Sequence, residues 1–163
     1  MIVVLADTHM PKGRRRLPGH CLELLGEARA AIHAGDFWSE SALADIEAVC
    51  PLLAAVRGNV DEPALRERLP ARAELELGGH RLGLVHDAGP AKGRLARLRR
   101  WFPEAEAVVF GHSHLPLHER DADGFQIFNP GSPTERRRAP RRSVGLLRAR
   151  PRGLELEHVW LRA

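Results

Sequence analysis

The stretch IVVLADTH, residues 2–9, joins an apolar run to two side chains that can bind a metal ion. The β-branched and aliphatic residues of Ile2–Ala6 are typical of a short buried strand. This strand is followed directly by Asp7, Thr8 and His9. Because residues two apart in an extended segment point to the same side, we expect Asp7 and His9 to lie together. The same succession, a core strand and then a polar group, recurs along the chain.

The first half of the chain alternates short apolar runs with amphipathic segments. Strands are expected at Ile2–Ala6, Ala30–Ala34 and Leu52–Val56, and helices at Cys21–Arg29, from a cap at Ser39 or Ser41 to about Val49, and at Glu62–Arg68. Such a β-α-β-α-β series predicts parallel strands that are covered by helices.

The second half is richer in strands. They are expected at Ala73–Leu77, Arg81–Val85, Ala107–Phe110, Leu117–Arg120, Phe125–Phe128, Val144–Arg150 and Leu154–Leu161, with one basic helix at Ala91–Arg100. Turn residues at Gly78-Gly79, Asp121–Gly124 and Pro151–Gly153 indicate antiparallel hairpins. The sequence thus predicts an α/β (α+β) fold, a four-layer α/β/β/α sandwich of two mixed β-sheets flanked by helices. No linker divides it, so residues 1–163 are expected to form a single domain.

Composition indicates an ordinary globular protein of 163 residues, 44% hydrophobic and 28% charged, with a net charge of +4. The absence of any apolar run of about 18 residues argues against a membrane span. The N-terminus has neither a basic segment nor a cleavage site, so no signal peptide is expected. Cys21 and Cys50 are too few and too far apart for a metal knuckle and fit a reducing compartment. We expect a cytoplasmic protein with buried thiols.

Polar side chains follow five more predicted strands. These segments are Gly35-Asp36, Gly58-Asn59-Val60-Asp61, His86-Asp87, Gly111-His112-Ser113-His114 and Asn129-Pro130-Gly131-Ser132. Ligand sites in open α/β sheets form at the carboxyl ends of strands, so these groups are expected to meet. A single histidine at a strand end more often has a structural role. The prediction therefore depends on the whole set.

The candidate ligands outnumber the needs of one metal ion. They are Asp7, His9, Asp36, Asn59, His86, His112 and His114. One divalent ion takes about four to six ligands, so this set favours two ions about 3.5–4 Å apart that share a carboxylate. Mixed imidazole and carboxylate donors favour Mn, Fe, Co, Ni or Zn over Ca. Spacing alone places His112 and His114 on one side of their segment.

The ordered motifs DTH, HAGD, RGNVD, VHD, FGHSH and NPGS, between Asp7 and Ser132, resemble those of the calcineurin-like metallophosphoesterases. They are most similar to the small bacterial and archaeal phosphodiesterases of that superfamily. The resemblance implies a metal-dependent phosphoesterase, most often a phosphodiesterase. Its nucleophile would be a hydroxide held between two divalent ions, with Mn²⁺ expected first and Ni²⁺, Co²⁺, Fe²⁺ or Zn²⁺ as alternatives.

The resemblance also implies a role for each ligand. The first ion would be held by Asp7, His9 and His114, the second by Asn59, His86 and His112, and Asp36 would bridge both. The catalytic residues would be Asp36, Asn59 and His112, and Asn59 would also orient the phosphate. For His33, orienting a ligand and plain packing stay open.

The chain departs from the family pattern at two positions. Val60 stands where many members have a histidine that protonates the leaving group, and valine donates no proton. The general acid typically contributes about 10²–10⁴-fold, so alkyl diesters should react poorly and aryl diesters well. Asp87 stands where glycine commonly follows the histidine. We expect Asp87 to cap the helix that begins near Ala91, with a water-binding role at the metals as the alternative.

Arginines cluster after two of the motifs. They are Arg14–Arg16 after DTH, and Arg136–Arg138, Arg141 and Arg142 after NPGS. These runs are expected to surround the mouth of the site, with Arg137 and Arg138 binding the substrate. The alternative is a set of solvated loops in a chain whose only lysines are Lys12 and Lys92. A further group, Arg94, Arg97, Arg99 and Arg100, is expected on the solvated face of its helix.

The expected partner is a small phosphate ester or a nucleotide. A phosphomonoesterase or a nucleotide pyrophosphatase would use the same centre. A non-catalytic alternative is a protein-binding scaffold, as in the eukaryotic retromer subunit of similar fold. A non-catalytic scaffold does not need the metal-binding residues. This chain has all seven of them, which favours an enzyme. Binding of nucleic acid and assembly into a homo-oligomer stay open.

Overall fold

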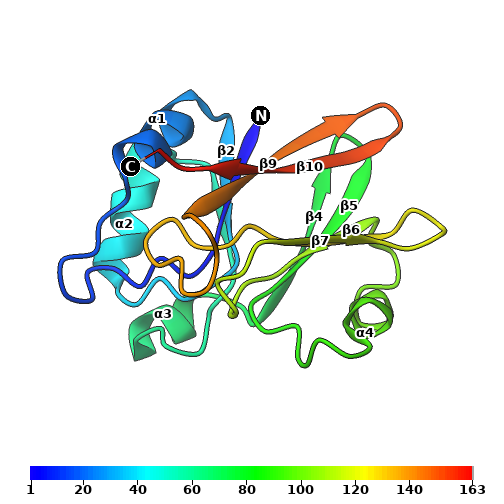
Figure 1. The fold of residues 1–163 in the computed structure, drawn as a ribbon, viewed down its shortest axis with the longest axis horizontal. Helices are drawn as coiled ribbons and strands as arrows, with labels where there is room; N and C mark the ends of the chain where they lie inside the picture. Colours follow the sequence, from blue (N-terminus) through cyan, green and yellow to red (C-terminus); the bar gives the residue numbers. More distant parts are fainter. Residues whose placement is uncertain (163) are drawn as a thin grey trace.

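Two five-stranded β-sheets pack face to face in the computed structural model, which describes residues 1–162 (Figure 1). The first sheet, in the order β10-β9-β1-β2-β3, contains β1 (Ile2–Leu5), β2 (Ala30–His33), β3 (Leu53–Ala55), β9 (Ser143–Arg150) and β10 (Gly153–Trp160). The second, in the order β4-β5-β6-β8-β7, contains β4 (Arg72–Leu77), β5 (His80–Val85), β6 (Ala107–Val109), β7 (Leu117–Arg120) and β8 (Gln126–Asn129). Each sheet pairs strands in both directions, so both are mixed, as predicted.

Helices cover the outer faces of both sheets. They are α1 (Gly19–Glu27), α2 (Glu40–Val49), α3 (Pro63–Arg68) and α4 (Arg94–Trp101). Figure 1 shows α1 and α2 against the first sheet and α4 beneath the second. The predicted α/β/β/α sandwich is confirmed. None of the helices within residues 1–162 combines the length and apolar character that a bilayer crossing needs.

Alternation along β1 explains how one strand serves two layers of the core. Val3 and Leu5 face outward into the cluster that contains Leu25 of α1. Val4 faces inward, into the cluster between the sheets that contains Leu84 of β5. Because successive strand side chains point to opposite faces, an unbroken apolar run is required when both faces are buried. The free thiols of Cys21 and Cys50 are buried, as expected.

The predicted elements are present, with shifts at some ends. Ser39, and not Ser41, caps α2, since its hydroxyl accepts a hydrogen bond from the amide of Ala42 at 3.3 Å. The predicted cap at Asp87 is wrong. Its carboxylate accepts from the amide of Gly89 at 2.7 Å, and α4 begins only at Arg94, after Gly93 in a left-handed conformation. The glycines and Pro90 in this segment keep it in a loop.

The prediction of a solvated arginine face on α4 is also partly wrong. Arg97 Nε donates to the carbonyl oxygen of Ala88 at 2.8 Å, and Arg94 donates to that of Gly89 at 3.3 Å. These two side chains are half-buried and hold the loop before the helix. Arg99 and Arg100 are exposed as expected. The carbonyl oxygens of Ala88 and Gly89 have no partner in a helix or strand within residues 1–162. They accept hydrogen bonds from Arg97 and Arg94, whose side chains would otherwise point into solvent.

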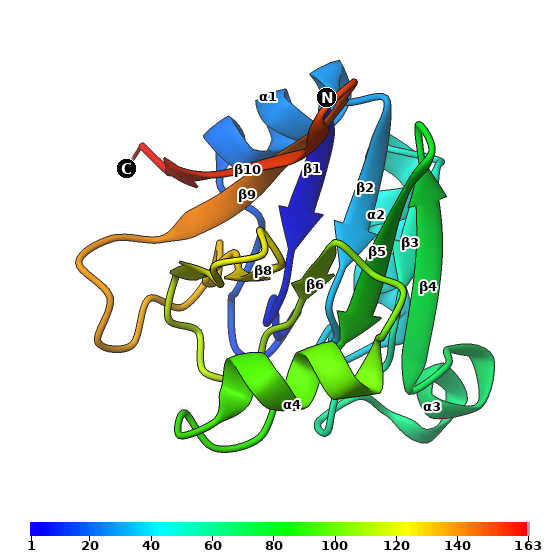
Figure 2. The ribbon, with the colours of Figure 1, turned by 90° about the vertical axis from the view of Figure 1, so that its right-hand side faces the viewer.

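Parallel pairing carries six strand ends to the same side of the sandwich, those of β1, β2 and β3 in the first sheet and of β5, β6 and β8 in the second. Strands β1, β2 and β5 run toward one end in Figure 2, and β6 runs parallel to β5. The loops after these strands therefore meet, and they contain the candidate ligands.

Candidate metal centre

Backbone hydrogen bonds join the loops that carry the candidate ligands. The amide of Asp7 donates to the carbonyl oxygen of Gly35 at 3.0 Å, and that of Gly111 donates to the carbonyl oxygen of His86 at 2.9 Å. Gly58 is required at this junction, because a Cβ there would lie 2.0 Å from Oδ1 of Asp36. The loops are thereby held in a fixed arrangement around the acidic and imidazole side chains.

Five of these residues adopt left-handed backbone conformations. They are Asp7, His9, Asp36, His112 and His114, with φ between 47° and 71°. Non-glycine residues rarely adopt such angles. Residues that do are concentrated at active sites and ligand-binding sites, where the side chain must point in a particular direction. The extended geometry assumed for DTH and GHSH is therefore wrong, although Asp7 and His9 still lie together. In the structure His112 and His114 belong to different groups of candidate ligands, as the resemblance implied.

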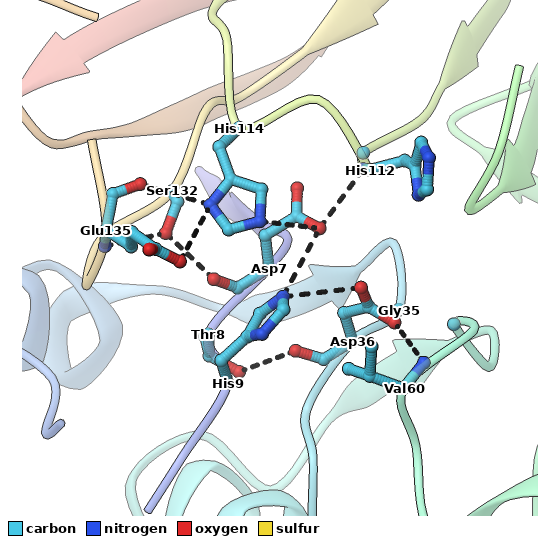
Figure 3. A network of polar contacts seen from close by, with 12 residues as sticks. Asp7, Thr8, His9, Gly35, Asp36, Val60, His112, His114, Ser132 and Glu135 are labelled. Carbon is cyan, nitrogen blue, oxygen red and sulfur yellow. Dashed lines mark hydrogen bonds and ion pairs between the residues drawn. The ribbon is translucent and has the colours of Figure 1, made fainter. Parts of the chain in front are cut away.

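The first group consists of Asp7, His9 and His114, all buried, whose candidate ligand atoms lie within 4.8 Å of one another (Figure 3). Oδ1 of Asp7 is 3.7 Å from Nε2 of His114 and 4.0 Å from Nε2 of His9. Among the described residues, Asp7 Oδ2, His9 Nε2 and His114 Nε2 have no hydrogen-bond partner. Buried polar atoms without a partner are costly, and three that converge fit a bound cation.

The second group consists of Asp36, His86 and His112, whose candidate ligand atoms also lie within 4.8 Å of one another. Nε2 of His86 is 3.2 Å from Oδ2 of Asp36. Oδ1 of Asn59 lies 3.0 Å from Nε2 of His86 and 3.0 Å from Nδ1 of His112. The structure thus brings Asn59 to the second group. Nδ1 of His86 donates to the carbonyl oxygen of Ala34 at 2.7 Å, which leaves Nε2 free to bind a metal.

Asp36 touches both groups. Its Oδ2 lies 3.3 Å from Nε2 of His9 and 3.2 Å from Nε2 of His86. Its Oδ1 accepts a hydrogen bond from the amide of Val60 at 3.0 Å. All seven candidate ligands are therefore adjacent, with one carboxylate between the two groups.

The electrostatics of this cluster indicate that protons occupy it when no cation does. Burial raises the pKa of Asp7 to about 7. Burial opposes the charge on His86, but the carboxylates of Asp36 and Asp7 outweigh it and raise the pKa of His86 to about 9. Burial likewise opposes ionisation of Asp36, but the imidazoles of His86 and His9 beside its carboxylate outweigh burial and hold its pKa well below the ordinary value. Metal ligands must be deprotonated, so a cation would displace these protons.

His33 packs in the core, and it also hydrogen-bonds to Thr8 and Gly35, which are neighbours in sequence of candidate ligands. Its ring stacks on Phe37 with centroids 3.6 Å apart and is fully buried. Its Nδ1 accepts from the amide of Gly35 at 3.1 Å, so Nε2 carries the proton and donates to the Thr8 hydroxyl at 3.1 Å. Burial lowers the pKa of His33 to about 3. His33 is therefore a neutral ring that joins the loops of Asp7 and Asp36 through Thr8 and Gly35.

The predicted arginines take different positions. Burial lowers the pKa of His114 to about 4, and the charge of the exposed Arg137 adds to this shift, so Arg137 is within electrostatic reach of the first group. Arg138 lines a cavity of about 470 Å³ together with Pro116, His158 and Trp160. Arg14–Arg16 line a different cavity of about 560 Å³ beside Met10.

The sequence motifs also contain residues whose roles were not predicted. The buried carboxylate of Asp61 accepts hydrogen bonds from the amides of Trp38 at 2.9 Å and Gly58 at 2.6 Å. The hydroxyl of Ser132 donates to the carbonyl oxygen of Asp7 at 2.8 Å. Asp61 is the last residue of the RGNVD motif and Ser132 the last of NPGS. Membership of these motifs was the sequence signal that could have identified them. Their function here is to hold the ligand loops together.

Comparison with known proteins agrees with this fold and site. A family model described as calcineurin-like phosphoesterase superfamily domain matches residues 1–151. The chain belongs to this superfamily. A probable metallophosphoesterase of Methanothermobacter thermautotrophicus is 31% identical over 136 residues, which cover 82% of this chain and 77% of that protein. The family uses divalent metals and hydrolyses phosphate esters, and the two groups of aspartate and histidine are suited to bind them.

Solved structures share the fold at lower identity. Zinc-bound Vps29 from Entamoeba histolytica has a TM-score of 0.76 and 21% identity, with 98% of each chain covered. Yfce, a phosphoesterase from E. coli, has a TM-score of 0.63 and 22% identity over 88% of this chain and 86% of that one. At these identities the likeness establishes the fold alone.

Proposed function

We propose that this protein is a phosphodiesterase with two divalent ions. The observation that supports it most directly is the pair of adjacent ligand groups that share Asp36. The first ion would be held by Asp7, His9 and His114, the second by Asn59, His86 and His112, and both by Asp36. Mn²⁺ is the proposed metal, with Ni²⁺, Co²⁺, Fe²⁺ and Zn²⁺ as alternatives.

Two divalent ions, when bound, supply an activated water at neutral pH and neutralise the charge that builds on phosphate oxygens. The proposed catalytic residues are Asp36, Asn59 and His112. Asn59 directs its amide oxygen to the imidazoles of His86 and His112, which leaves its amide nitrogen as a donor to a phosphate oxygen. His112 is exposed, so the second group lies open to a substrate.

Positive charge at the mouth of the site supports an anionic substrate. Arg137 is exposed and close enough to His114 to lower its pKa. We assign it to the phosphate or to an anionic substituent of the ester. The contact expected for Arg138 stays a prediction, since this side chain lines the neighbouring cavity with Trp160.

Val60 contributes a backbone amide to Asp36 and no side-chain proton. A leaving group at this centre would therefore depart without a general acid from position 60. A good leaving group departs without being protonated. An aryl or similarly activated diester is therefore the proposed substrate.

Metal-depleted protein supplied separately with Mn²⁺, Ni²⁺, Co²⁺, Mg²⁺ or Zn²⁺ tests the proposal on aryl monoesters and diesters. We expect diester hydrolysis with at least one ion and its loss in Asp36→Asn. Preference for monoesters would favour the phosphomonoesterase alternative. The likeness to Vps29 supports a protein-binding scaffold as the second candidate, and hydrolysis with none of the ions would favour it.

A further inference from the structure

Glu135 lies behind His114, on the side of the imidazole opposite to Asp7 (Figure 3). Nε2 of His114 faces Oδ1 of Asp7 at 3.7 Å. Nδ1 of the same ring lies 3.2 Å from the backbone carbonyl oxygen of Glu135 and 3.5 Å from Oε2 of its carboxylate. One residue thus directs both a carbonyl oxygen and a negative charge toward the nitrogen that does not face the metal group.

The carboxylate of Glu135 is itself held from outside. Nη2 of Arg15 lies 3.0 Å from Oε1 of Glu135, and both side chains are about one quarter to one third exposed, at 25% and 31%. Arg15 belongs to the loop that follows His9, whereas Glu135 follows the NPGS motif. The pair therefore joins two loops across the first ligand group and fixes the direction of the carboxylate.

The backbone of Glu135 is fixed as well. Its amide donates to the hydroxyl of Ser132 at 3.0 Å, and this hydroxyl donates to the carbonyl oxygen of Asp7 at 2.8 Å. Glu135 is thereby tied to the same loop that supplies Asp7. Neither its backbone nor its side chain is free to move away from His114 without breaking a hydrogen bond or an ion pair.

We propose that Glu135, held by Arg15, is a positioning residue for His114. An acceptor at Nδ1 keeps the ring proton there and leaves the lone pair of Nε2 for a metal ion. The carbonyl oxygen selects this tautomer, and the carboxylate adds negative charge that strengthens the imidazole as a ligand. This inference rests on the proposed dinuclear centre and adds a determinant of affinity for its first ion.

Titration of metal-free protein with Mn²⁺ by calorimetry, with a competing chelator, tests this role in Glu135→Gln. We expect one of two binding events to weaken about 10–100-fold while the other is unchanged, as is typical when a partner of a ligating histidine is lost. The matched control is Glu47→Gln, because Glu47 also pairs with an arginine, Arg68, at 3.0 Å, but far along the chain on an exposed surface. It should leave both events unchanged.

Arg15→Gln provides a second measurement if Glu135→Gln does not fold, and it should weaken the same event to a smaller extent. Unchanged affinity of both events would overturn the inference, as would equal weakening of both with a lower melting temperature of the metal-free protein. These outcomes concern the variants and can be told apart from failure of the proposed function, which would be seen in wild-type protein. If wild-type protein binds neither Mn²⁺ nor any of Ni²⁺, Co²⁺, Fe²⁺ and Zn²⁺ in the same titration, the dinuclear centre is wrong and the inference is wrong with it.

Discussion

Oδ2 of Asp36 lies 3.3 Å from Nε2 of His9, although the two residues belong to different groups of candidate ligands. The same oxygen is 3.2 Å from His86 of its own group. Without a cation, a proton on His86, whose pKa is raised to about 9, accounts for its short distance to this carboxylate. If the proposed cations bind, Asp36 is the residue expected to contact both, because its carboxylate faces a candidate ligand of each group.

Metal binding should depend on pH in the direction that proton displacement requires. The pKa of Asp7 is about 7 and that of His86 is about 9, so at pH 6 both carry a proton that a cation must remove. We expect the apparent affinity for Mn²⁺ to rise as the pH increases from about 6 to 9. Calorimetry in buffers of different ionisation enthalpy would measure the released protons. Affinity that does not change over this range would contradict the assignment.

The stability of the metal-free protein should carry a signature of His33. Its folded pKa is about 3, below the 6.5 of an unfolded histidine. Below pH 6.5, His33 therefore binds a proton in the unfolded chain but not in the folded chain. The free energy of unfolding falls for this reason as the pH decreases toward 3. The expected slope is about 1.4 kcal/mol per pH unit from this residue. Denaturant unfolding of wild type and His33→Asn between pH 6.5 and 4.5 should show a smaller slope in the variant, and equal slopes would refute the role of His33.

Substrate preference should reflect Val60. Without a proton donor there, bis-p-nitrophenyl phosphate should be hydrolysed faster than a dialkyl phosphate by more than their intrinsic reactivities require, by up to about 10²–10⁴-fold. Steady-state rates on both esters, each compared with its uncatalysed rate, provide the measurement. Equal rate enhancements would show that another residue supplies the proton.

Arg137 should contribute to substrate capture more than Arg138. A contact between a guanidinium and an anionic ester is worth about 1.5 kcal/mol, so Arg137→Ala should lower kcat/KM about tenfold. It should also flatten the dependence of kcat/KM on ionic strength with a nucleotide ester. Arg138→Ala, measured in the same way, tests the contact predicted for Arg138, and a smaller loss of kcat/KM is expected there. Unchanged salt dependence in Arg137→Ala would instead identify these arginines as a solvated loop.

Strand positions were predictable from the sequence because strands buried on both faces require apolar runs, as at Ile2–Leu5 and Ala107–Val109. The identity of the candidate ligands followed from polar residues at the ends of such runs. Their left-handed backbone did not, because aspartate and histidine adopt positive φ more often than most residues but still only in a small minority of cases, so Asp7 and His114 carry no sequence signal for it.

Other features depend on contacts between distant segments. Nothing near Glu135 in the sequence indicates that Arg15 holds it or that His114 faces it, since these contacts form only when three loops meet. The loop before α4 likewise accepts hydrogen bonds from Arg94 and Arg97, whereas helical periodicity alone predicted that both side chains face solvent. Local patterns fix neither the loop conformation nor the partner of a long side chain.

The most direct test of the dinuclear centre is the number of metal ions bound per chain, measured by elemental analysis after reconstitution and gel filtration. We expect two ions in wild-type protein, at most one in Asp36→Asn, and diester hydrolysis at least about 100-fold slower in that variant, since loss of even an outer partner of a ligand costs about 10–100-fold. Asp123→Asn, at an exposed carboxylate, should match wild type. One ion or none in wild-type protein, or full activity in Asp36→Asn, would contradict the account.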